Sequence, residues 1–478
     1  MNPVIWRSIL LALLVLLSAC VPSLPRREHT AMELPKEYLQ AESSPEAQML
    51  ADKVWSQFFT EPRLVGLIDT AVKNNQELAM LEQEISVANN EIMARHGEYQ
   101  PKVSGQAAGG VEKAERFSSA DANGPTRFAH AGLVMNWEVD IWKKLRNATK
   151  AAYLRYLAGI EGRRYVVTNL VAEISYTYYE LMSLDNQLRA VQDYVEVVAK
   201  VKNMVDLQRQ AGRTTSLGVK RFEAEVAKNR AREYDLKQRI AIAENRLNLL
   251  LGRFPQPIER DPSRYLETAF SEIQTTVPVK LLENRPDIRQ ASLNLEARKL
   301  DVEVARARFY PSLTIDATVG YEAFNSEHFD GTPVSLASGL VGGLTAPLLN
   351  RKAIEASYRS ANDLQIQAVF NYEFTLLQAF TEVTNQIIKV KNLRSRYEMK
   401  QQELKALRDS IQISNVLFKA GRIEYIDVLL TQRDYLEAEI SLLEVKQTQL
   451  EATIGLYKAM GGGWRGQHEQ SREPHWQP

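Results

Sequence analysis

The pattern of apolar and polar residues has two different periodicities, which occur in different parts of the chain. Between residues 312 and 323 the two kinds of position alternate strictly, and the apolar ones are Leu313, Ile315, Ala317, Val319, Tyr321 and Ala323. Such alternation over about ten residues predicts a β-strand with one apolar and one polar face. The surrounding segments have a helical periodicity instead. The sequence therefore predicts a mostly helical protein that also carries amphipathic strands.

The longest helical pattern runs from Trp142 to Ala211, a stretch without proline. Its apolar residues follow a spacing of three and four: Val167, Leu170, Ile174, Leu181, Leu184, Leu188, Val191, Val195, Val198 and Val205. The spacing continues over residues 219–250 and again over 429–457. It predicts antiparallel coiled-coil hairpins. A helix of about 70 residues is roughly 105 Å long if unbroken, and Gly159 and Gly162 are the positions where it could bend.

The chain contains an internal duplication. The segment GEYQPKVSGQAAGG at 97–110 matches ARFYPSLTIDATVG at 307–320, and an Ala-Gly-Arg turn occurs at both 211–213 and 420–422. We predict two repeats, 61–252 and 275–461, each with the order helix, strand, strand, very long helix, turn and long helix. Their first helices are predicted at 62–97 and 279–308.

Each repeat supplies a predicted strand pair, whose second strands lie at about 127–139 and 334–346. A small sheet packed with its apolar face on a helix would explain the alternation. The strands are, however, about long enough to cross a bilayer, and closed membrane barrels use eight or more strands. Copies of the chain would therefore have to combine their strands. Two copies make a barrel that side chains fill, whereas three copies leave room for a passage.

Composition excludes some classes of partner. The 478 residues include 59 basic and 59 acidic residues, so no general affinity for nucleic acid is expected. Hydrophobic residues at 45% and charged residues at 25% are typical of a soluble protein. No segment has the roughly 18–20 consecutive apolar residues of a membrane-spanning helix.

The N-terminus indicates export and lipid attachment. Residues 1–19 have the charge, apolar run and small residues of a secretory signal peptide. The only cysteine, Cys20, ends the segment LSAC, which resembles the lipobox of bacterial lipoproteins. We predict that Cys20 is acylated and that residues 20–60 form a lipid-anchored segment; the alternative is an incidental thiol beside a cleavage site. Val21 follows the cysteine, and in lipoproteins generally this favours the outer membrane. No internal disulfide can form.

Both predicted hairpins turn at glycine. Gly212 and Gly421 suit the left-handed position after a helix end, and residues 214–216 (Thr, Thr, Ser) can cap the next helix. Arg213 and Arg422 would be exposed at the tips, where a partner protein can reach them.

Asp427 lies at the start of the last long helix. It can oppose the positive end of the helix dipole, which contributes about 0.3–1 kcal/mol. If three copies converge at one end of a tunnel, it can also form a ring of charge that filters ions. These two roles stay equally open from the sequence.

Several features together resemble one family, the TolC-like outer-membrane efflux lipoproteins. They are the lipobox, the duplicated unit, LLENRPDIRQA at 281–291 and WEVDIWKK at 137–144. The resemblance covers the chain to about residue 464. It implies a homotrimer with a 12-stranded transmembrane β-barrel, continued by a 12-helix periplasmic α-barrel. The linker 253–274 would join an equatorial belt, and 462–478 would be a polar tail.

The resemblance also implies a function and partners. The protein would be a lipid-anchored outer-membrane channel extending into the periplasm, a passive exit duct of a tripartite efflux pump. Its tips would dock a periplasmic adaptor, which links it to an inner-membrane transporter of the resistance-nodulation-division class. Family members carry acidic residues just after the tips. Asp427 matches this position, and Tyr425 would add bulk to a periplasmic gate. The first repeat has Gly218 at the equivalent position. Leu430 stands where some members have a second aspartate.

Two other functions were weighed. An enzyme is disfavoured because the six histidines show no metal-ligand spacing and no nucleophile or phosphate-binding motif is found; no cofactor other than the lipid on Cys20 is expected. A lipid-anchored periplasmic coiled-coil adaptor, or a structural protein, would share the hairpins and the anchor. It would become soluble in a Cys20→Ser variant, whereas a barrel would still insert.

Overall fold

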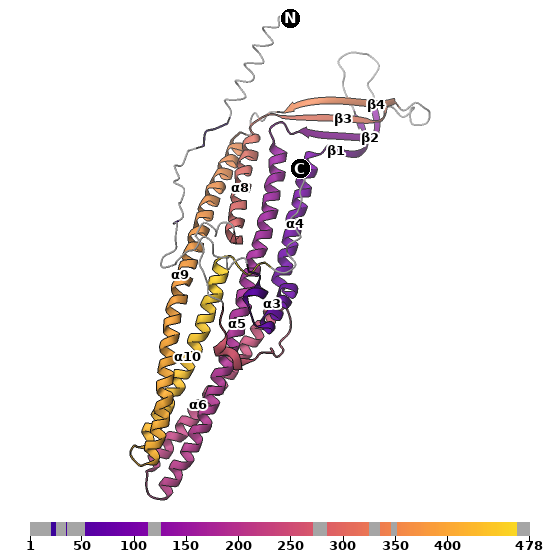
Figure 1. Cartoon of the computed structure of the whole chain (residues 1–478). Coiled ribbons are helices and arrows are strands. Elements are labelled where there is room, and N and C mark those ends of the chain that lie inside the picture. Colours follow the sequence, from indigo (N-terminus) through magenta and orange to yellow (C-terminus); the bar gives the residue numbers. More distant parts are fainter. Residues whose placement is uncertain are drawn as a thin grey trace, which may run out of the picture. The chain divides into compact units, whose positions relative to one another are not determined.

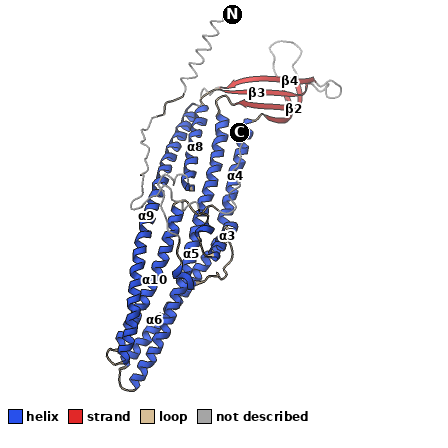
Figure 2. Ribbon diagram, in the orientation of Figure 1, coloured by secondary structure: helices blue, strands red, loops and turns tan. Residues whose placement is uncertain are grey.

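The computed structural model describes residues 21–24, 35, 53–112, 126–270, 284–324, 335–345 and 351–465. The chain forms two compact units. Unit 1 comprises residues 1–31, 83–160 and 290–373, and unit 2 comprises 32–82, 161–289 and 374–478. Helices make up most of the described chain, and the strands belong to unit 1 (Figure 2). The predicted signal peptide, Cys20 and the tail beyond residue 465 lie outside the described residues.

The helices follow the predicted periodicity. Their bounds are α2 Trp55–Phe58, α3 Pro62–Asn74, α4 Gln76–Tyr99, α5 Lys144–Gln210, α6 Ser216–Leu250, the 3₁₀-helix η2 Pro262–Glu267, α8 Pro286–Ala307, α9 Arg351–Lys419 and α10 Tyr425–Ala459 (Figure 1). The 67 residues of α5 form one helix, so neither Gly159 nor Gly162 breaks it. Among the described residues, no helix combines the length and the apolar character that a bilayer crossing needs.

The predicted first helix at 62–97 is wrong in one respect, because it is two helices separated at Asn75. The backbone N–H of Asn75 donates to Ala71 O at 2.8 Å and closes α3. Its side-chain Oδ1 accepts from the Leu78 N–H at 3.1 Å and caps the start of α4. Asparagine at a helix N-terminus satisfies a backbone donor that the helix itself leaves free, so one residue ends α3 and begins α4.

The sheet of unit 1 consists of β1 Lys102–Glu112, β2 Thr126–Val139, β3 Ser312–Phe324 and β4 Ser335–Thr345, all antiparallel in the order β1-β2-β3-β4. The central β2–β3 pair joins the two predicted repeats. Gly132 lies opposite Gly320 in this pair. A Cβ at Gly132 would lie 2.5 Å from Val319 O, and one at Gly320 would lie 2.6 Å from Ala131 O. Only glycine therefore permits this close approach of the two strands.

The register brings the apolar positions of all four strands onto one face. Leu133 pairs with Val319, Ala317 pairs with Leu340, and the polar pair Asn136 and Asp316 lies on the opposite face. The apolar face is exposed in the single chain: Leu133 retains 54% and Leu340 76% of its accessible surface. The alternative of a sheet that buries this face on a helix is therefore wrong for these residues.

Unit 2 contains an aromatic core that fixes the end of α10. Phe58 stacks on Tyr457 at 4.1 Å and on Phe270 at 5.0 Å between ring centroids. The Tyr457 hydroxyl donates to Lys53 O at 2.7 Å. Burial raises the pKa of Tyr457 because the ionised phenolate would lose its hydration. This core joins residues near the two ends of the described chain.

The RPDIR string of the sequence forms a buried ion-pair network in unit 2. Pro286 begins α8, seven residues after the start expected for the helix at 279–308; residues 279–283 lie outside the described residues. Arg285 is 4% exposed. Its guanidinium donates to Asp287 Oδ2 at 2.8 Å and to Glu382 Oε2 at 2.9 Å. It also caps the end of α10 by donating to Ala459 O at 2.8 Å. One side chain thus links the start of α8 to α9 and to the end of α10.

Candidate functional site

The two hairpin turns have the same geometry. Gly212 and Gly421 both have φ = +68°, the left-handed conformation that glycine adopts without strain, as predicted. Arg213 N donates to Gln208 O at 2.8 Å, and Arg422 N donates to Leu417 O at 2.9 Å. These bonds close the ends of α5 and α9. Arg213 and Arg422 are exposed, and neither forms an ion pair within the described residues.

The predicted caps differ between the repeats. Thr215 is the N-cap residue of α6, but its hydroxyl makes no capping bond, so that prediction is wrong. The turn is closed by the backbone instead, because Gly218 N donates to Thr215 O at 3.3 Å. In the second repeat, Glu424 and Asp427 form a reciprocal capping box in which Asp427 Oδ2 accepts from Glu424 N at 3.1 Å. Asp427 thus stabilises the start of α10 and remains exposed.

The ring of Tyr425 explains the missing acid of the first repeat. A Cβ placed on Gly218 would lie 3.0–3.2 Å from atoms of the Tyr425 ring. The same ring is 6.1 Å from Phe222 on α6. The position equivalent to Asp427 is therefore covered by an aromatic side chain from the other hairpin. The sequence showed Gly218 without showing this contact, because the two residues are about 200 positions apart.

A hollow lies between α9 and α10 in unit 2. It has a volume of about 520 Å³ and is lined by Lys400, Glu403, Ala406, Leu407, Asp434, Glu437 and Ala438. Lys400 pairs with Glu403 at 2.6 Å, whereas Asp434 pairs with Arg433 at 3.1 Å. The hollow therefore has an acidic wall. The sequence analysis did not find it.

The residues directly after Cys20 pack on unit 1. Val21 and Leu24 are partly buried against a cluster formed by Val302, Ala305, Phe309 and Tyr358. The rings of Phe309 and Tyr358 are perpendicular, with centroids 5.7 Å apart. We call residues 21–24 the strap. It lies on the end of α8, immediately before β3.

Indole groups fix the ends of the strands to the helices. Trp137 Nε1 donates to Tyr99 O at 3.1 Å, and Trp142 Nε1 donates to Pro311 O at 2.9 Å. The ring of Trp142 stacks on Tyr310 with a centroid distance of 4.6 Å. The WEVDIWKK string thus fixes β2 to Tyr99 at the end of α4 and the segment before α5 to Pro311 just before β3.

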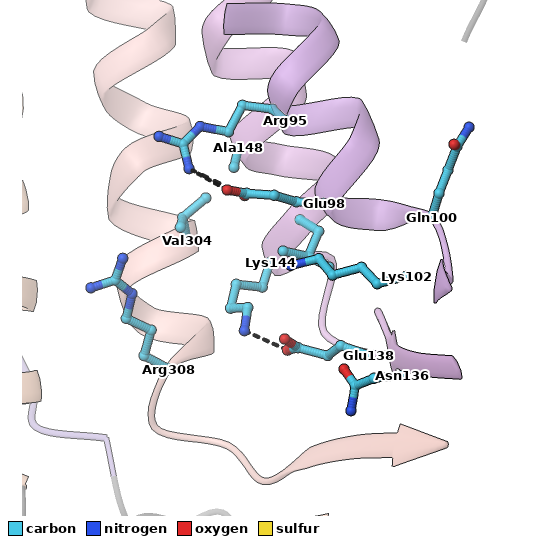
Figure 3. A pocket seen from close by; sticks show the side chains of 11 residues that line it. Arg95, Glu98, Gln100, Lys102, Asn136, Glu138, Lys144, Ala148, Val304 and Arg308 are labelled. Carbon is cyan, nitrogen blue, oxygen red and sulfur yellow. Dashed lines mark hydrogen bonds and ion pairs between the residues drawn. The ribbon is translucent and has the colours of Figure 1, made fainter. Parts of the chain in front are cut away.

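A second hollow, of about 310 Å³, lies in unit 1 where β1 and β2 meet the ends of α4 and α8 and the start of α5; we call it the basic hollow (Figure 3). Its walls comprise Arg95, Glu98, Gln100, Lys102, Asn136, Glu138, Lys144, Leu145, Ala148, Val304 and Arg308. Arg95 pairs with Glu98 at 3.2 Å, and Lys144 pairs with Glu138. The sequence does not reveal this hollow, because its walls come from three separate segments, 95–102, 136–148 and 304–308.

The part of the chain that the structure describes contains no group of three or more metal-ligating side chains. Of the six histidines, His96 and His130 lie within it. The arrangement of this part offers surfaces, turns and hollows rather than a set of convergent reactive groups.

Comparison with known proteins shows which family shares these features. The family model for outer membrane efflux protein matches residues 67–253 and 277–462. The pyoverdine export outer membrane protein OpmQ of Pseudomonas putida is 28% identical over 433 residues, which cover 89% of this chain and 91% of the relative. The probable outer membrane lipoprotein SilC of Salmonella typhimurium is 26% identical over 461 residues, which cover 94% of this chain and 97% of SilC.

Solved structures share the fold. The open state of the outer membrane channel MtrE of Neisseria gonorrhoeae superposes with a TM-score of 0.82 at 22% identity, covering 93% of this chain and 98% of that one. CusC gives 0.79 at 24% identity, with 92% and 99% covered. The fold is therefore that of the TolC-like channels, mostly helical with a β part. Since the family model matches most of the chain, the chain belongs to the outer membrane efflux protein family and is a TolC-like efflux channel of the outer membrane.

Proposed function

We propose that three copies of the chain combine their strands into one 12-stranded transmembrane β-barrel and their helices into a 12-helix α-barrel. The homotrimer is then a passive exit duct for small molecules, with no catalytic step. The observation that carries this proposal is the four-stranded sheet with one exposed apolar face. In lipid, backbone groups at a sheet edge must be paired, and twelve strands leave a passage that eight do not.

The same face argues against the periplasmic adaptor. An adaptor in water would bury the side chains of Leu133, Val319 and Leu340, because exposed apolar patches of this kind mark an interface with lipid or protein. In the duct they contact the hydrocarbon of the outer membrane, and the polar face lines the lumen.

The partners follow from the family and from the tips. Relatives include an antibiotic efflux pump outer membrane protein and a cation efflux system protein. For this chain we propose a periplasmic adaptor bound at the Gly212–Arg213 and Gly421–Arg422 turns, and through it an inner-membrane transporter. Two exposed arginines and the acidic hollow between α9 and α10 give a docking partner both signs of charge.

We further propose that Cys20 carries the lipid and that the strap positions it. Val21 and Leu24 pack on the cluster at the end of α8 and the start of α9, and Cys20 directly precedes Val21 in the sequence. SilC, a relative, is named a lipoprotein. The periplasmic gate is proposed at Asp427 and Tyr425: three Asp427 carboxylates around one opening would repel anions and attract cations.

The trimer is tested by joining strand edges. Gln106 on β1 and Val341 on β4 lie on the same face at opposite edges of the sheet. A chain carrying both Gln106→Cys and Val341→Cys is treated with a short bismaleimide in outer-membrane preparations. We expect covalent species up to the trimer, because β4 of one copy lies beside β1 of the next.

Gln106→Cys alone is the matched control, since it places thiols on only one edge. It should give no ladder of linked chains. If the double variant also stays monomeric under conditions that modify both thiols, the shared barrel is wrong.

A further inference from the structure

The basic hollow of unit 1 has more positive than negative charge on its walls. Four cations line it, together with two carboxylates: Arg95, Lys102, Lys144 and Arg308 against Glu98 and Glu138. Each carboxylate is held by one of these cations, Glu98 by Arg95 and Glu138 by Lys144. Lys102 and Arg308 have no ion pair or hydrogen bond from their side chains to any described residue. Two cations therefore remain available to a ligand.

The two free cations come from different walls. Lys102 begins β1, and Arg308 follows the end of α8; Figure 3 shows the two side chains on opposite sides of the same hollow. Asp316, the carboxylate on the neighbouring part of the sheet, accepts a hydrogen bond from Asn136. The strand register places Asn136 between Asp316 and Lys102. Asp316 is therefore already hydrogen-bonded and does not lie beside Lys102 in the sheet.

The chemistry of these groups defines a class of ligand. A guanidinium binds a carboxylate or phosphate with two parallel hydrogen bonds, whereas an ammonium acts as a compact point charge. A ligand with two or more anionic groups can meet both cations, and its remaining oxygens can accept from the amides of Gln100 and Asn136. The volume of about 310 Å³ suits a molecule of the size of citrate.

We propose that the basic hollow is a binding site for small soluble polyanions, of the carboxylate or phosphate class. Lys102, Asn136 and Glu138 belong to the polar face of the sheet, which in the proposed duct faces the lumen; the location in the lumen thus rests on the proposed function. The site itself does not, because one chain supplies all its walls. In the duct, the hollow would hold such a polyanion at the periplasmic end of the barrel.

Citrate is the probe, titrated by calorimetry into the full-length protein in detergent at low salt. We expect one citrate per chain, with an affinity that falls as salt rises because the hollow is open to solvent. Lys102→Gln and Arg308→Gln should each weaken binding by about 10-fold or more, the effect of losing one charged hydrogen-bond donor. Arg306→Gln is the matched control: Arg306 lies on the last turn of α8, two residues before Arg308, and is exposed but does not line the hollow. This variant should change the affinity by less than about twofold.

Two results would overturn the proposal. The first is no saturable binding up to about 10 mM citrate, an affinity too weak to matter. The second is equal weakening by Arg306→Gln and Arg308→Gln, which would mean a general surface attraction. A chain that is not trimeric but binds citrate as described would refute the duct and leave this site intact.

Discussion

A positive charge should destabilise the protein when it is placed on the apolar face of β2 and have little effect on the polar face. The neighbouring residues Leu133 and Val134 test this difference. Leu133 lies near the middle of β2, 54% exposed, and pairs with Gly105 and Val319 on the apolar face. An arginine on the lipid side at the bilayer midplane costs about 2–4 kcal/mol. Leu133→Arg should therefore lower the ratio of folded to unfolded protein by roughly 30- to 1,000-fold per chain.

Val134→Arg is the matched control, because the same charge enters the same strand one position along. Val134 pairs with Ser104 and Thr318 and lies on the polar face. We expect it to change stability by less than about 1 kcal/mol. The assay is urea unfolding of the protein in lipid vesicles, together with the amount resisting urea extraction from outer membranes. Equal loss in both variants, or a greater loss for Val134→Arg, would refute the assignment of the faces.

Three further predictions concern unit 2. Lys446 is 6% exposed, and its ammonium lies 5.2 Å from the centroid of the Tyr397 ring. Burial lowers the pKa of Lys446, so the folded state disfavours the ammonium. Lys446→Met should stabilise the protein at pH 7 by roughly 0.5–2 kcal/mol, measured by thermal unfolding. This gain in stability should shrink as the pH rises toward the ordinary lysine pKa. A gain that stays constant with pH would contradict the burial argument. Arg285→Met should cost about 3–5 kcal/mol, because it removes the donor from Ala459 O and from the partly buried carboxylates of Asp287 and Glu382. A double-mutant cycle with Glu382→Gln should show coupling rather than additivity. Asp427→Asn keeps a cap acceptor, so it should change the free energy of unfolding by no more than about 1 kcal/mol. It should reduce the cation selectivity measured by conductance in a lipid bilayer. Unchanged selectivity would mean that Asp427 is not part of the gate.

The strands could be predicted from the sequence because their signal is local. Alternation has a period of two, and a shift of one residue would reverse both faces, so the pattern defines the strand closely. The strand expected at 127–139 differs by only one residue from the observed Thr126–Val139. The left-handed turns at Gly212 and Gly421 were equally accessible, since a glycine after a long helical pattern is a strong end signal.

Other features depend on contacts between distant segments. The Tyr425 ring on Gly218 and the packing of the strap on Phe309 join residues about 200 or more positions apart. The break at Asn75 depends on one residue that serves as cap for two helices. None of these contacts changes the local periodicity, which is why the hydrophobic pattern could not reveal them.

The central claim is that one barrel is shared between copies of the chain. The most direct test is the protein mass of outer-membrane material extracted in detergent, measured by light scattering with the bound detergent subtracted. The account predicts the mass of three chains of 54.2 kDa each. A stable, folded monomer in that extract would contradict it, because the four strands in the described part of one chain are too few to close a transmembrane barrel.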